Sequence, residues 1–517
     1  MRRLAWPVGA HPSDIPHAGT RATPFPAFIP QPVSLLAALL FTFFGPPEAI
    51  SGNADRPQHW PQFRGPGSAG VAESARPPVR FDRQTNLLWE LPLPAGNSSP
   101  CIVADRIFLT GQDRDELVTL CVERPTGHLL WRRSLHSDRI EPFYPRLNSA
   151  ASPTPACDGA AVFVYFGSFG LIAYDLAGEE KWRSPLPMPV TEFGTGTSPM
   201  LAGELLVLNC DQDFGSYLLA VHKHNGQTAW RTQRAEFPRG FGTPILWRHD
   251  QTEELVVPGT VWLTAYQVAN GHERWRVRAS ARVVCTTPVA GDGLLFAASW
   301  SPGGDSANRI SMSAFQAFAA EHDRNRDGLI TKDEIPPGPL VERFSQIDAD
   351  KSGVITRAEW DAMRVIFDRA DNCLAAIRPG GKGDITATHL AWRQTRGLPY
   401  VPSPLYYRGR VYLVKNGGLI SCFEAQTGRP VYIEERLDAL GDYYASPVAA
   451  DGRIYLASQN GVIVVIAAAD ELRVLARNEL GQALFATPAL AGDALYVRTD
   501  RTLLAFGPPA RLRPAAK

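Results

Sequence analysis

The sequence predicts an all-β fold, an eight-bladed β-propeller, with a small α-helical EF-hand pair inserted in the fifth blade. Two observations lead to this prediction. A Ser-Pro or Thr-Pro dipeptide recurs along the chain, at intervals of mostly 41 to 53 residues, and a fixed period of this length is typical of repeat architectures. Two twelve-residue stretches with the pattern of a calcium-binding loop lie within the one long interval.

Each repeat is consistent with four short strands. The Pro signal opens an apolar strand, a turn that often contains Asp-Gly follows, and the last strand often ends in Trp. The signals are Ser99-Pro100, Ser152-Pro153, Ser198-Pro199, Thr243-Pro244, Thr287-Pro288, Ser403-Pro404, Ser446-Pro447 and Thr487-Pro488. Four strands per repeat predict a β-propeller, whose radial packing leaves little exposed sheet edge.

The two ends of the repeat region are predicted to meet. The eighth repeat ends after the strand at 502–506, so its outermost strand is missing, and the apolar segment 86–91 before the first signal can supply it. We therefore expect a propeller over 87–508, preceded by a lead-in at 55–86 and followed by a disordered tail at 509–517.

The interval between Pro288 and Pro404 exceeds a typical repeat by about 72 residues, the size of the segment 301–371 that holds both calcium loops. Calcium ligands are expected at positions 1, 3, 5, 7, 9 and 12 of each loop. In the first loop these are Asp323, Asn325, Asp327, the Leu329 carbonyl, Thr331 and Glu334. In the second they are Asp348, Asp350, Ser352, the Val354 carbonyl, Thr356 and Glu359.

Other features of the two stretches support this interpretation. Gly328 and Gly353 occupy the sixth position, where a positive φ is needed, and Ile330 and Ile355 should pair as a short strand. Asp-, Asn- and Gly-rich runs also form ordinary turns, but two complete loops flanked by helical patterning favour calcium. One helix, roughly 338–347, is expected to serve both loops. This compressed pair favours a structural role for calcium over a sensor role.

The N-terminus predicts export. An apolar run at 33–44 is too short to span a bilayer but suits a secretory signal, with cleavage near Ala54. We expect a leader at 1–54, a secreted or periplasmic protein, and no transmembrane span in the mature chain. Lys plus Arg and Asp plus Glu are balanced at 52 each, which gives no general attraction to nucleic acid.

A Gly-x-x-x-Trp spacing recurs at the ends of several repeats: Gly127 to Trp131, Gly178 to Trp182, Gly226 to Trp230 and Gly271 to Trp275. This element, the opening stretch 60–66 and the segment 380–384 followed by Trp392 resemble the quinoprotein-like propeller family. That group includes the pyrroloquinoline quinone dehydrogenases and the propeller lipoprotein of outer-membrane protein assembly. The stretch 60–66 and the segment 380–384 most resemble a secreted bacterial subfamily with an EF-hand pair in the propeller. The resemblance implies that each Trp packs between neighbouring blades.

The resemblance also raises the possibility of a quinone-dependent oxidoreductase. Such enzymes typically cover pyrroloquinoline quinone with a disulfide between adjacent cysteines, whereas the seven cysteines of this chain are all isolated in sequence. The cysteine pattern therefore does not support the cofactor. Some quinone enzymes lack this pair, so the enzyme stays as the alternative to a binding or assembly scaffold.

Residues just before the Pro signals are expected to face one end of the central funnel. They are Asn148, Thr197, Arg239, Phe241, Arg282, Tyr400, Tyr443, Tyr444 and Phe485. Arginine and tyrosine side chains can bind a planar or anionic ligand or a peptide, and aromatic residues at such places can equally plug the channel. The sequence thus predicts a monomeric, calcium-binding scaffold with an unknown protein, peptide or small-molecule ligand at the funnel or at the EF-hand pair, and no catalytic residue.

Overall fold

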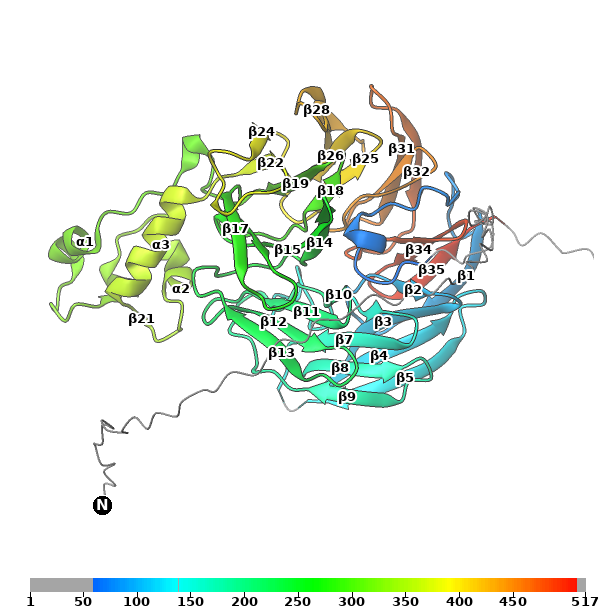
Figure 1. Cartoon of the computed structure of the whole chain (residues 1–517), viewed down its shortest axis with the longest axis horizontal. Coiled ribbons are helices and arrows are strands. Elements are labelled where there is room, and N and C mark those ends of the chain that lie inside the picture. Colours follow the sequence, from blue (N-terminus) through cyan, green and yellow to red (C-terminus); the bar gives the residue numbers. More distant parts are fainter. Residues whose placement is uncertain (1–58, 138, 509–517) are drawn as a thin grey trace, which may run out of the picture. The chain divides into compact units, whose positions relative to one another are not determined.

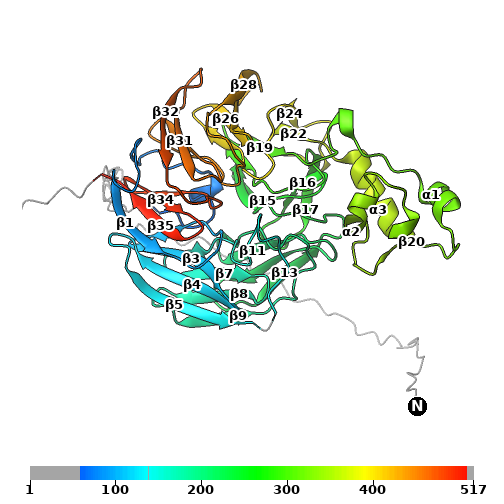
Figure 2. The ribbon, with the colours of Figure 1, turned by 180° about the vertical axis from the view of Figure 1, so that it is seen from behind.

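The computed structural model describes residues 59–137 and 139–508. In this part of the chain eight sheets of four or five strands follow one another around a ring, and a cluster of helices lies at its side (Figures 1 and 2). The predicted all-β, eight-bladed propeller is confirmed. Among the described residues, no helix has the length and apolar character needed to cross a membrane. The predicted leader at 1–54 and tail at 509–517 lie outside the described residues.

In each of the first four blades, four antiparallel strands follow sequence order. Blade 1 comprises β2 (Cys101–Val103), β3 (Arg106–Asp113), β4 (Glu116–Glu123) and β5 (Leu129–His136). Blade 2 comprises β6 (Ala156–Cys157), β7 (Ala161–Phe166), β8 (Gly170–Asp175) and β9 (Glu180–Ser184). Blade 3 comprises β10 (Met200–Ala202), β11 (Leu205–Cys210), β12 (Tyr217–His222) and β13 (Thr228–Gln233). Blade 4 comprises β14 (Ile245–His249), β15 (Thr252–Pro258), β16 (Trp262–Tyr266) and β17 (Glu273–Arg278).

Blade 5 is interrupted between its second and third strands. It comprises β18 (Val289–Gly291), β19 (Leu294–Ser299), β22 (Cys373–Ile377) and β24 (Leu390–Gln394). Between the last two, β23 (Gly383–Asp384) crosses to blade 4 and pairs in parallel with β17. Blade 6 comprises β25 (Leu405–Tyr407), β26 (Arg410–Lys415), β27 (Leu419–Glu424) and β28 (Pro430–Arg436), and blade 7 comprises β29 (Val448–Ala450), β30 (Arg453–Ala457), β31 (Val462–Ala467) and β32 (Val474–Glu479).

The last blade joins the two ends of the propeller. Its strands are β33 (Ala489–Ala491), β34 (Ala494–Arg498), β35 (Thr502–Phe506) and, outermost, β1 (Leu87–Pro92). β1 pairs antiparallel with β35 from Leu87 opposite Phe506 to Pro92 opposite Thr502. This pairing confirms the predicted closure, which leaves no gap between the first and last repeats.

The Ser and Thr residues of the Pro signals form hydrogen bonds from blade to blade around the axis. In each bond the backbone N–H of one such residue donates to the side-chain hydroxyl of the next blade's residue, for example Ser198 N to Thr243 Oγ1 at 3.1 Å. Seven of these buried bonds, 2.9 to 3.1 Å long, link the eight blades in the described chain. In blade 2 the participant is Thr154, which precedes Pro155, and not the expected Ser152. The Ser or Thr residue before each of these prolines therefore helps to hold neighbouring blades together.

The Gly-x-x-x-Trp elements also join neighbouring blades. The Trp182 indole of blade 2 donates its Nε1–H to the Lys223 carbonyl of blade 3 at 2.8 Å. Gly226, with a φ of +70°, lies so close to the same indole that a Cβ there would be 2.4 Å from Trp182 Cε3. The same indole-to-carbonyl bond occurs at Trp89, Trp131, Trp230 and Trp392. The expected packing of Trp between blades is thus present. Trp275 differs, because its Nε1–H donates to Glu254 of its own blade.

The segment between β19 and β22 forms the helical insert, defined here as residues 300–372. It contains α1 (Phe315–His322), β20 (Ile330–Thr331), η3 (Lys332–Glu334), η4 (Val341–Arg343), α2 (Phe344–Ile347), β21 (Val354–Ile355) and α3 (Arg357–Arg369), with η2 (Ser306–Asn308) near its start. Ile330 pairs with Ile355, as expected. The helix expected at roughly 338–347 is instead a 3-10 turn followed by one α-turn over 341–347.

The insert has its own apolar core, which continues onto the propeller. Trp360 is fully buried against Phe315 and Phe318, with ring centroids 6.2 and 4.2 Å apart. Val261 of blade 4 belongs to the same apolar cluster. At the neck, Ser301 N donates to Asn372 Oδ1 and Asn372 Nδ2 donates to the Ser301 carbonyl, both at 3.0 Å. The two hydrogen bonds close the neck of the insert, and the apolar contact with Val261 attaches the insert to the ring.

The lead-in before β1 lies across the propeller. Trp60 forms a bridge with Ile102 of blade 1, and Val71 forms one with Ala449 of blade 7. Between them, Arg64 donates to the Pro404 carbonyl of blade 6 at 2.7 Å, close to the short 3-10 helix η1 (Pro66–Ser68). The lead-in therefore contacts blades 1, 6 and 7 before it joins blade 8 as β1.

Candidate functional site

The second loop of the insert brings carboxylates together. One oxygen each from Asp348, Asp350 and Glu359 lie within 4.8 Å of one another, a grouping that can hold a metal ion. Asp348 directly follows α2, and Glu359 lies in the first turn of α3, so two helices position the group. Carboxylate and carbonyl oxygens are the ligands that Ca²⁺ prefers. The donor chemistry of this loop fits calcium.

The first loop has the same backbone arrangement. Glu334 Oε1 accepts from Arg324 N at 2.9 Å and its Oε2 from Thr331 N at 2.8 Å. Glu359 repeats this pattern with Ala349 N and Thr356 N, at 2.9 and 2.8 Å. Each twelfth-position glutamate is thus held across its loop by backbone N–H groups. These N–H groups, with the Thr331 hydroxyl, keep the pKa of Glu334 below its usual value.

Two further details of the loops fit a cation. Asp323 Oδ1, at position 1 of the first loop, is buried and has no hydrogen-bond partner, which is costly for a carboxylate oxygen unless something else binds it. Gly328 and Gly353 have φ of +79° and +89°, as the sixth position requires. The remaining predicted ligands, Asn325, Asp327, Leu329, Thr331, Ser352, Val354 and Thr356, lie between these positions along the same two loops.

A second candidate site lies on the propeller axis. It is a cavity of about 400 Å³, called here the funnel cavity, and every blade contributes to its lining. Of the residues predicted to face the funnel, Asn148, Arg239, Phe241, Arg282, Tyr400, Tyr444 and Phe485 do line it. Thr197 and Tyr443 do not. Tyr443 is fully buried between blades and donates its hydroxyl to the Ala439 carbonyl. The aromatic residues therefore line a cavity and do not fill the channel.

Arginines give the funnel cavity a positive lining. Arg239 is 3% and Arg282 7% exposed, and Arg343 of the insert lies beside them in the lining. Burial, followed by the charges of Arg343 and Arg239, lowers the pKa of Arg282 to about 10. All three arginines line this one cavity.

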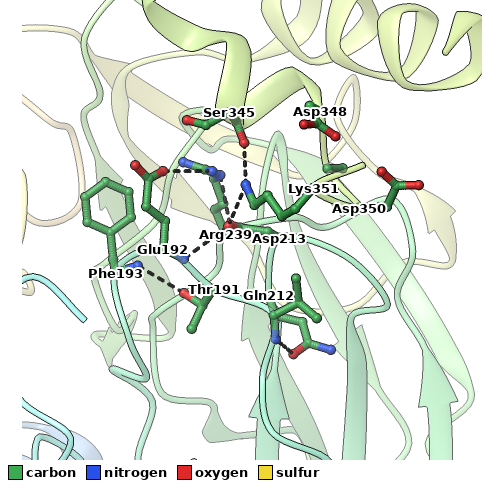
Figure 3. Close-up of polar contacts among 12 residues, drawn as sticks. Thr191, Glu192, Phe193, Gln212, Asp213, Arg239, Ser345, Asp348, Asp350 and Lys351 are labelled. Carbon is green, nitrogen blue, oxygen red and sulfur yellow. Dashed lines mark hydrogen bonds and ion pairs between the residues drawn. The ribbon is translucent and has the colours of Figure 1, made fainter. Parts of the chain in front are cut away.

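The insert and the funnel cavity are joined by polar contacts (Figure 3). Lys351, in the second calcium loop, pairs with Asp213 of blade 3 through its Nζ and Oδ2 at 3.3 Å. Asp213 in turn pairs with Arg239 Nε at 2.9 Å. Gln346 of α2 accepts from Arg282 at 2.5 Å. The insert, which belongs to blade 5 in sequence, therefore also contacts blades 3 and 4 and the loop that enters blade 5.

The cysteines contribute no disulfide to this region. All seven are free, six of them lie in blade strands, and Cys285 lines the funnel cavity. Burial raises the pKa of the Cys285 thiol to about 12, so it is protonated at neutral pH and is a poor nucleophile.

Fold and repeat together define a propeller built from the repeats found in quinoproteins. A family model described as "Outer membrane protein assembly factor BamB" matches residues 79–247 and 364–508, more than half of the chain. The chain belongs to this family of pyrroloquinoline-quinone-type repeat propellers, as its motifs led us to expect. A separate EF-hand model matches residues 340–363, which include the second calcium loop. No curated protein matches the chain.

Solved structures agree with the fold. BamB from Moraxella catarrhalis is 13% identical, with a TM-score of 0.52 over 81% of this chain and 99% of that one. A europium-containing methanol dehydrogenase is 10% identical, with a TM-score of 0.54 over 85% and 89%. A quinohemoprotein alcohol dehydrogenase from Comamonas testosteroni is 11% identical, with a TM-score of 0.50 over 89% and 82%. At these identities the likeness shows the fold alone.

Sequence reasoning missed the residues that the insert contributes to the funnel cavity. Glu342, Arg343 and Gln346 line it, and Lys351 reaches the Asp213–Arg239 pair from the calcium loop. A signal was present, because Lys351 occupies a non-ligating position between two predicted ligands, Asp350 and Ser352. Its partner in blade 3 is more than 130 residues away in sequence, so the contact depends on how the insert folds back on the ring.

Proposed function

We propose that this chain is a secreted or periplasmic calcium-binding propeller that acts as a binding or assembly scaffold, with calcium ordering the inserted EF-hand pair. The observation that carries the proposal is the convergence of Asp348, Asp350 and Glu359 in a loop bounded by two helices. Three carboxylates held this close repel one another unless a cation lies between them. Extracellular-type EF-hand sites bind calcium at about 10⁻⁴ to 10⁻³ M, a range suited to an exported protein.

The scaffold role rests on the same geometry. The ring is closed by β1 and by hydrogen bonds from blade to blade, so it keeps its shape without the insert. The insert is joined to the ring by its neck, by apolar packing against Val261 of blade 4 and by polar contacts such as that of Lys351 with Asp213. Calcium therefore shapes an appendage, and the ring presents it to a partner.

Limited proteolysis of the full chain tests this proposal. With calcium we expect protection of the segment 301–371, and in calcium-free buffer we expect cleavage there while the remaining blades stay intact. The Glu359→Gln variant loses a bidentate ligand and should be cleaved in the insert even with calcium present. Equal cleavage of the insert in both buffers would contradict the proposal.

A quinone-dependent oxidoreductase is the second candidate function. One observation favours it: the funnel cavity has volume and arginine N–H groups for a planar anionic cofactor. The test is to reconstitute the chain with pyrroloquinoline quinone and calcium. The enzyme hypothesis predicts a bound-cofactor absorbance and dye-linked turnover, and the absence of both would exclude it.

A further inference from the structure

A separate cavity of about 500 Å³, called here the blade 5–6 pocket, lies between blades 5 and 6 beside the start of the insert. Trp300 and Asp305 of the insert form one wall, and the loop between β24 and β25 forms another. Blade 6 contributes the end of β26 and a residue of β28. The pocket shares Tyr400 with the funnel cavity. Its volume is in the range of small-molecule sites.

The β28 residue of the pocket, Glu434, has a strained backbone. Its φ of +56° is a left-handed value, which is unfavourable for a residue with a Cβ. It lies in a bulge, where Ile433 and Glu434 lie opposite the single residue Ser421 of β27. The outermost strand pairs of the other described blades have one irregularity each, whereas this pair has two. Bulges redirect side chains at functional sites, and strained residues concentrate there.

The loop that enters blade 6 fits against the same bulge. The Ser421 hydroxyl accepts from Glu434 N at 3.0 Å. Gly397 has a φ of +69°, and a Cβ there would overlap that hydroxyl oxygen, so the position requires glycine. The neighbours of Gly397, Arg396 and Leu398, line the pocket. The bulge and the loop therefore fix two walls of the pocket relative to each other.

The charges of the pocket lining cancel. Its cations are Arg396 and Lys415, and its anions are Asp305 and Glu434. Glu434 pairs through Oε1 with Lys415 Nζ at 2.5 Å and through Oε2 with Arg396 Nη2 at 3.6 Å. The hydrogen bond from Lys415 and the charges of both cations lower the pKa of Glu434. A lining whose charges are already compensated favours a neutral ligand over an ion.

Hydrogen-bond donors and acceptors nevertheless remain available in the pocket. Lys415 uses one of its three N–H groups, on Glu434. Asn416 accepts from Tyr443 N at 2.8 Å through its Oδ1, and its amide NH₂ has no partner in the described chain. The Glu434 carboxylate supplies acceptors beside these donors. Each hydroxyl group both donates and accepts, so this mixture matches a molecule with several adjacent hydroxyls.

Trp300 adds an aromatic surface in a fixed orientation. Its Nε1–H donates to Asp305 Oδ2 at 3.1 Å, and its ring meets Tyr400 edge-on with centroids 5.9 Å apart. Asn372 at the neck of the insert donates to the other oxygen of Asp305 at 2.9 Å. The negative face of an aromatic ring attracts C–H groups, and a sugar ring presents C–H groups between its hydroxyls.

We propose that the blade 5–6 pocket binds a neutral saccharide, whose ring packs on Trp300 and whose hydroxyls bond to Lys415, Asn416 and Glu434. The proposal goes beyond the calcium-binding scaffold and does not depend on it, because none of the predicted calcium ligands lines this pocket.

Calorimetry of the full chain with three neutral trisaccharides, cellotriose, maltotriose and triacetylchitotriose, tests the proposal. We expect at least one of them to give binding heat at millimolar concentration, both with calcium and in calcium-free buffer. Trigalacturonate, which carries three carboxylates, should give none, because the compensated lining offers no counter-charge.

Three variants locate the site. Trp300→Ala should abolish the saccharide heat. Glu434→Gln should weaken binding by about tenfold, since a charged acceptor forms stronger hydrogen bonds than an amide. Glu435→Gln is the matched control, because Glu435 is the next residue of β28, is exposed and does not line the pocket. It should bind like the wild type.

The outcomes separate this proposal from the calcium-binding function. No heat from any of the three neutral trisaccharides, or heat from trigalacturonate alone, would overturn the saccharide site and leave the calcium function standing. Saccharide heat without calcium heat would overturn the calcium function alone. Should Trp300→Ala fail to fold, Glu434→Gln decides the location, and binding as tight as in Glu435→Gln would overturn it.

Discussion

Buried carboxylates at single positions differ sharply in their surroundings. Glu334 of the first calcium loop accepts hydrogen bonds from the backbone N–H groups of Thr331 and Arg324, which lower its pKa. Glu141, by contrast, is 1% exposed, and its Oε2 has no hydrogen-bond partner. Its Oε1 accepts from Thr195 N at 3.0 Å and from Thr195 Oγ1 at 2.6 Å. Burial outweighs these bonds and raises the pKa of Glu141 to about 7.

The raised pKa of Glu141 predicts a stability that depends on pH. The folded protein holds this proton more tightly than the unfolded chain, so the contribution of Glu141 to the free energy of unfolding is fully present below about pH 4.5 and is lost as the pH rises to about 7. The contribution of this group is roughly 3 kcal/mol at about 1.4 kcal/mol per pKa unit. The free energy of unfolding, measured with urea across this pH range, should fall with rising pH for the wild type and change less for Glu141→Gln. Parallel curves for the two proteins would contradict the assignment.

The glycine of a Gly-x-x-x-Trp element lies against the tryptophan of the preceding blade. The two residues are so close that no side chain would fit between them. A Cβ on Gly226 would lie 2.4 Å from Trp182, while one on Gly203 of the same blade would have no atom within 4 Å. Both glycines have positive φ, +70° and +61°. A substitution by alanine would strain the backbone at both positions, but only at Gly226 would the new Cβ clash with a neighbouring side chain.

This pair gives a matched test of blade docking. Gly203→Ala should lower stability by about 1 to 2 kcal/mol, the cost of a left-handed conformation for a residue with a Cβ. Gly226→Ala should cost several kcal/mol in all, because overpacking adds about 1 to 3 kcal/mol when the Trp182 indole is pushed away from Lys223. Thermal unfolding of the two variants measures the difference. Equal losses of stability in the two variants would show that the contact with the Trp182 indole does not limit the size of residue 226.

Many of the contacts between neighbouring strands and blades can be predicted from short stretches of sequence. The Gly-x-x-x-Trp elements, the Pro signals and the calcium loops each lie within a few residues, so spacing alone predicts them. The choice between Ser152 and Thr154 for blade 2 could not be made, because both precede a proline and only pairing with Ser99 and Ser198 distinguishes them. The contacts of Lys351 and Arg343 depend on the docked position of the insert, which no local pattern specifies.

Over the whole molecule, the ring is held by a repeated hydrogen bond at its centre and by one strand at its seam. Loss of a central hydroxyl leaves a buried N–H of the neighbouring blade without an acceptor, as for Ser198 N opposite Thr243. Such an unsatisfied donor costs about 1 to 3 kcal/mol. The insert lies outside this set of contacts, so we expect the ring to persist if the insert loses its order.

The central hydrogen bonds can be tested at one position. Thr243→Val keeps the shape of the side chain and removes the acceptor, so we expect a loss of about 1 to 3 kcal/mol in the free energy of unfolding. Thr243→Ser keeps the acceptor and should lose less. Denaturant unfolding of both variants measures the effect, and a valine variant as stable as the serine variant would argue against a structural role for the ring of hydroxyls.

Calorimetry of calcium binding to the purified chain determines whether the insert of this propeller is a calcium site. We expect heat from two sites in the wild type, and from one site in Glu334→Gln and in Glu359→Gln, since each variant removes the twelfth ligand of one loop. No heat from added calcium, with both glutamates intact, would contradict it.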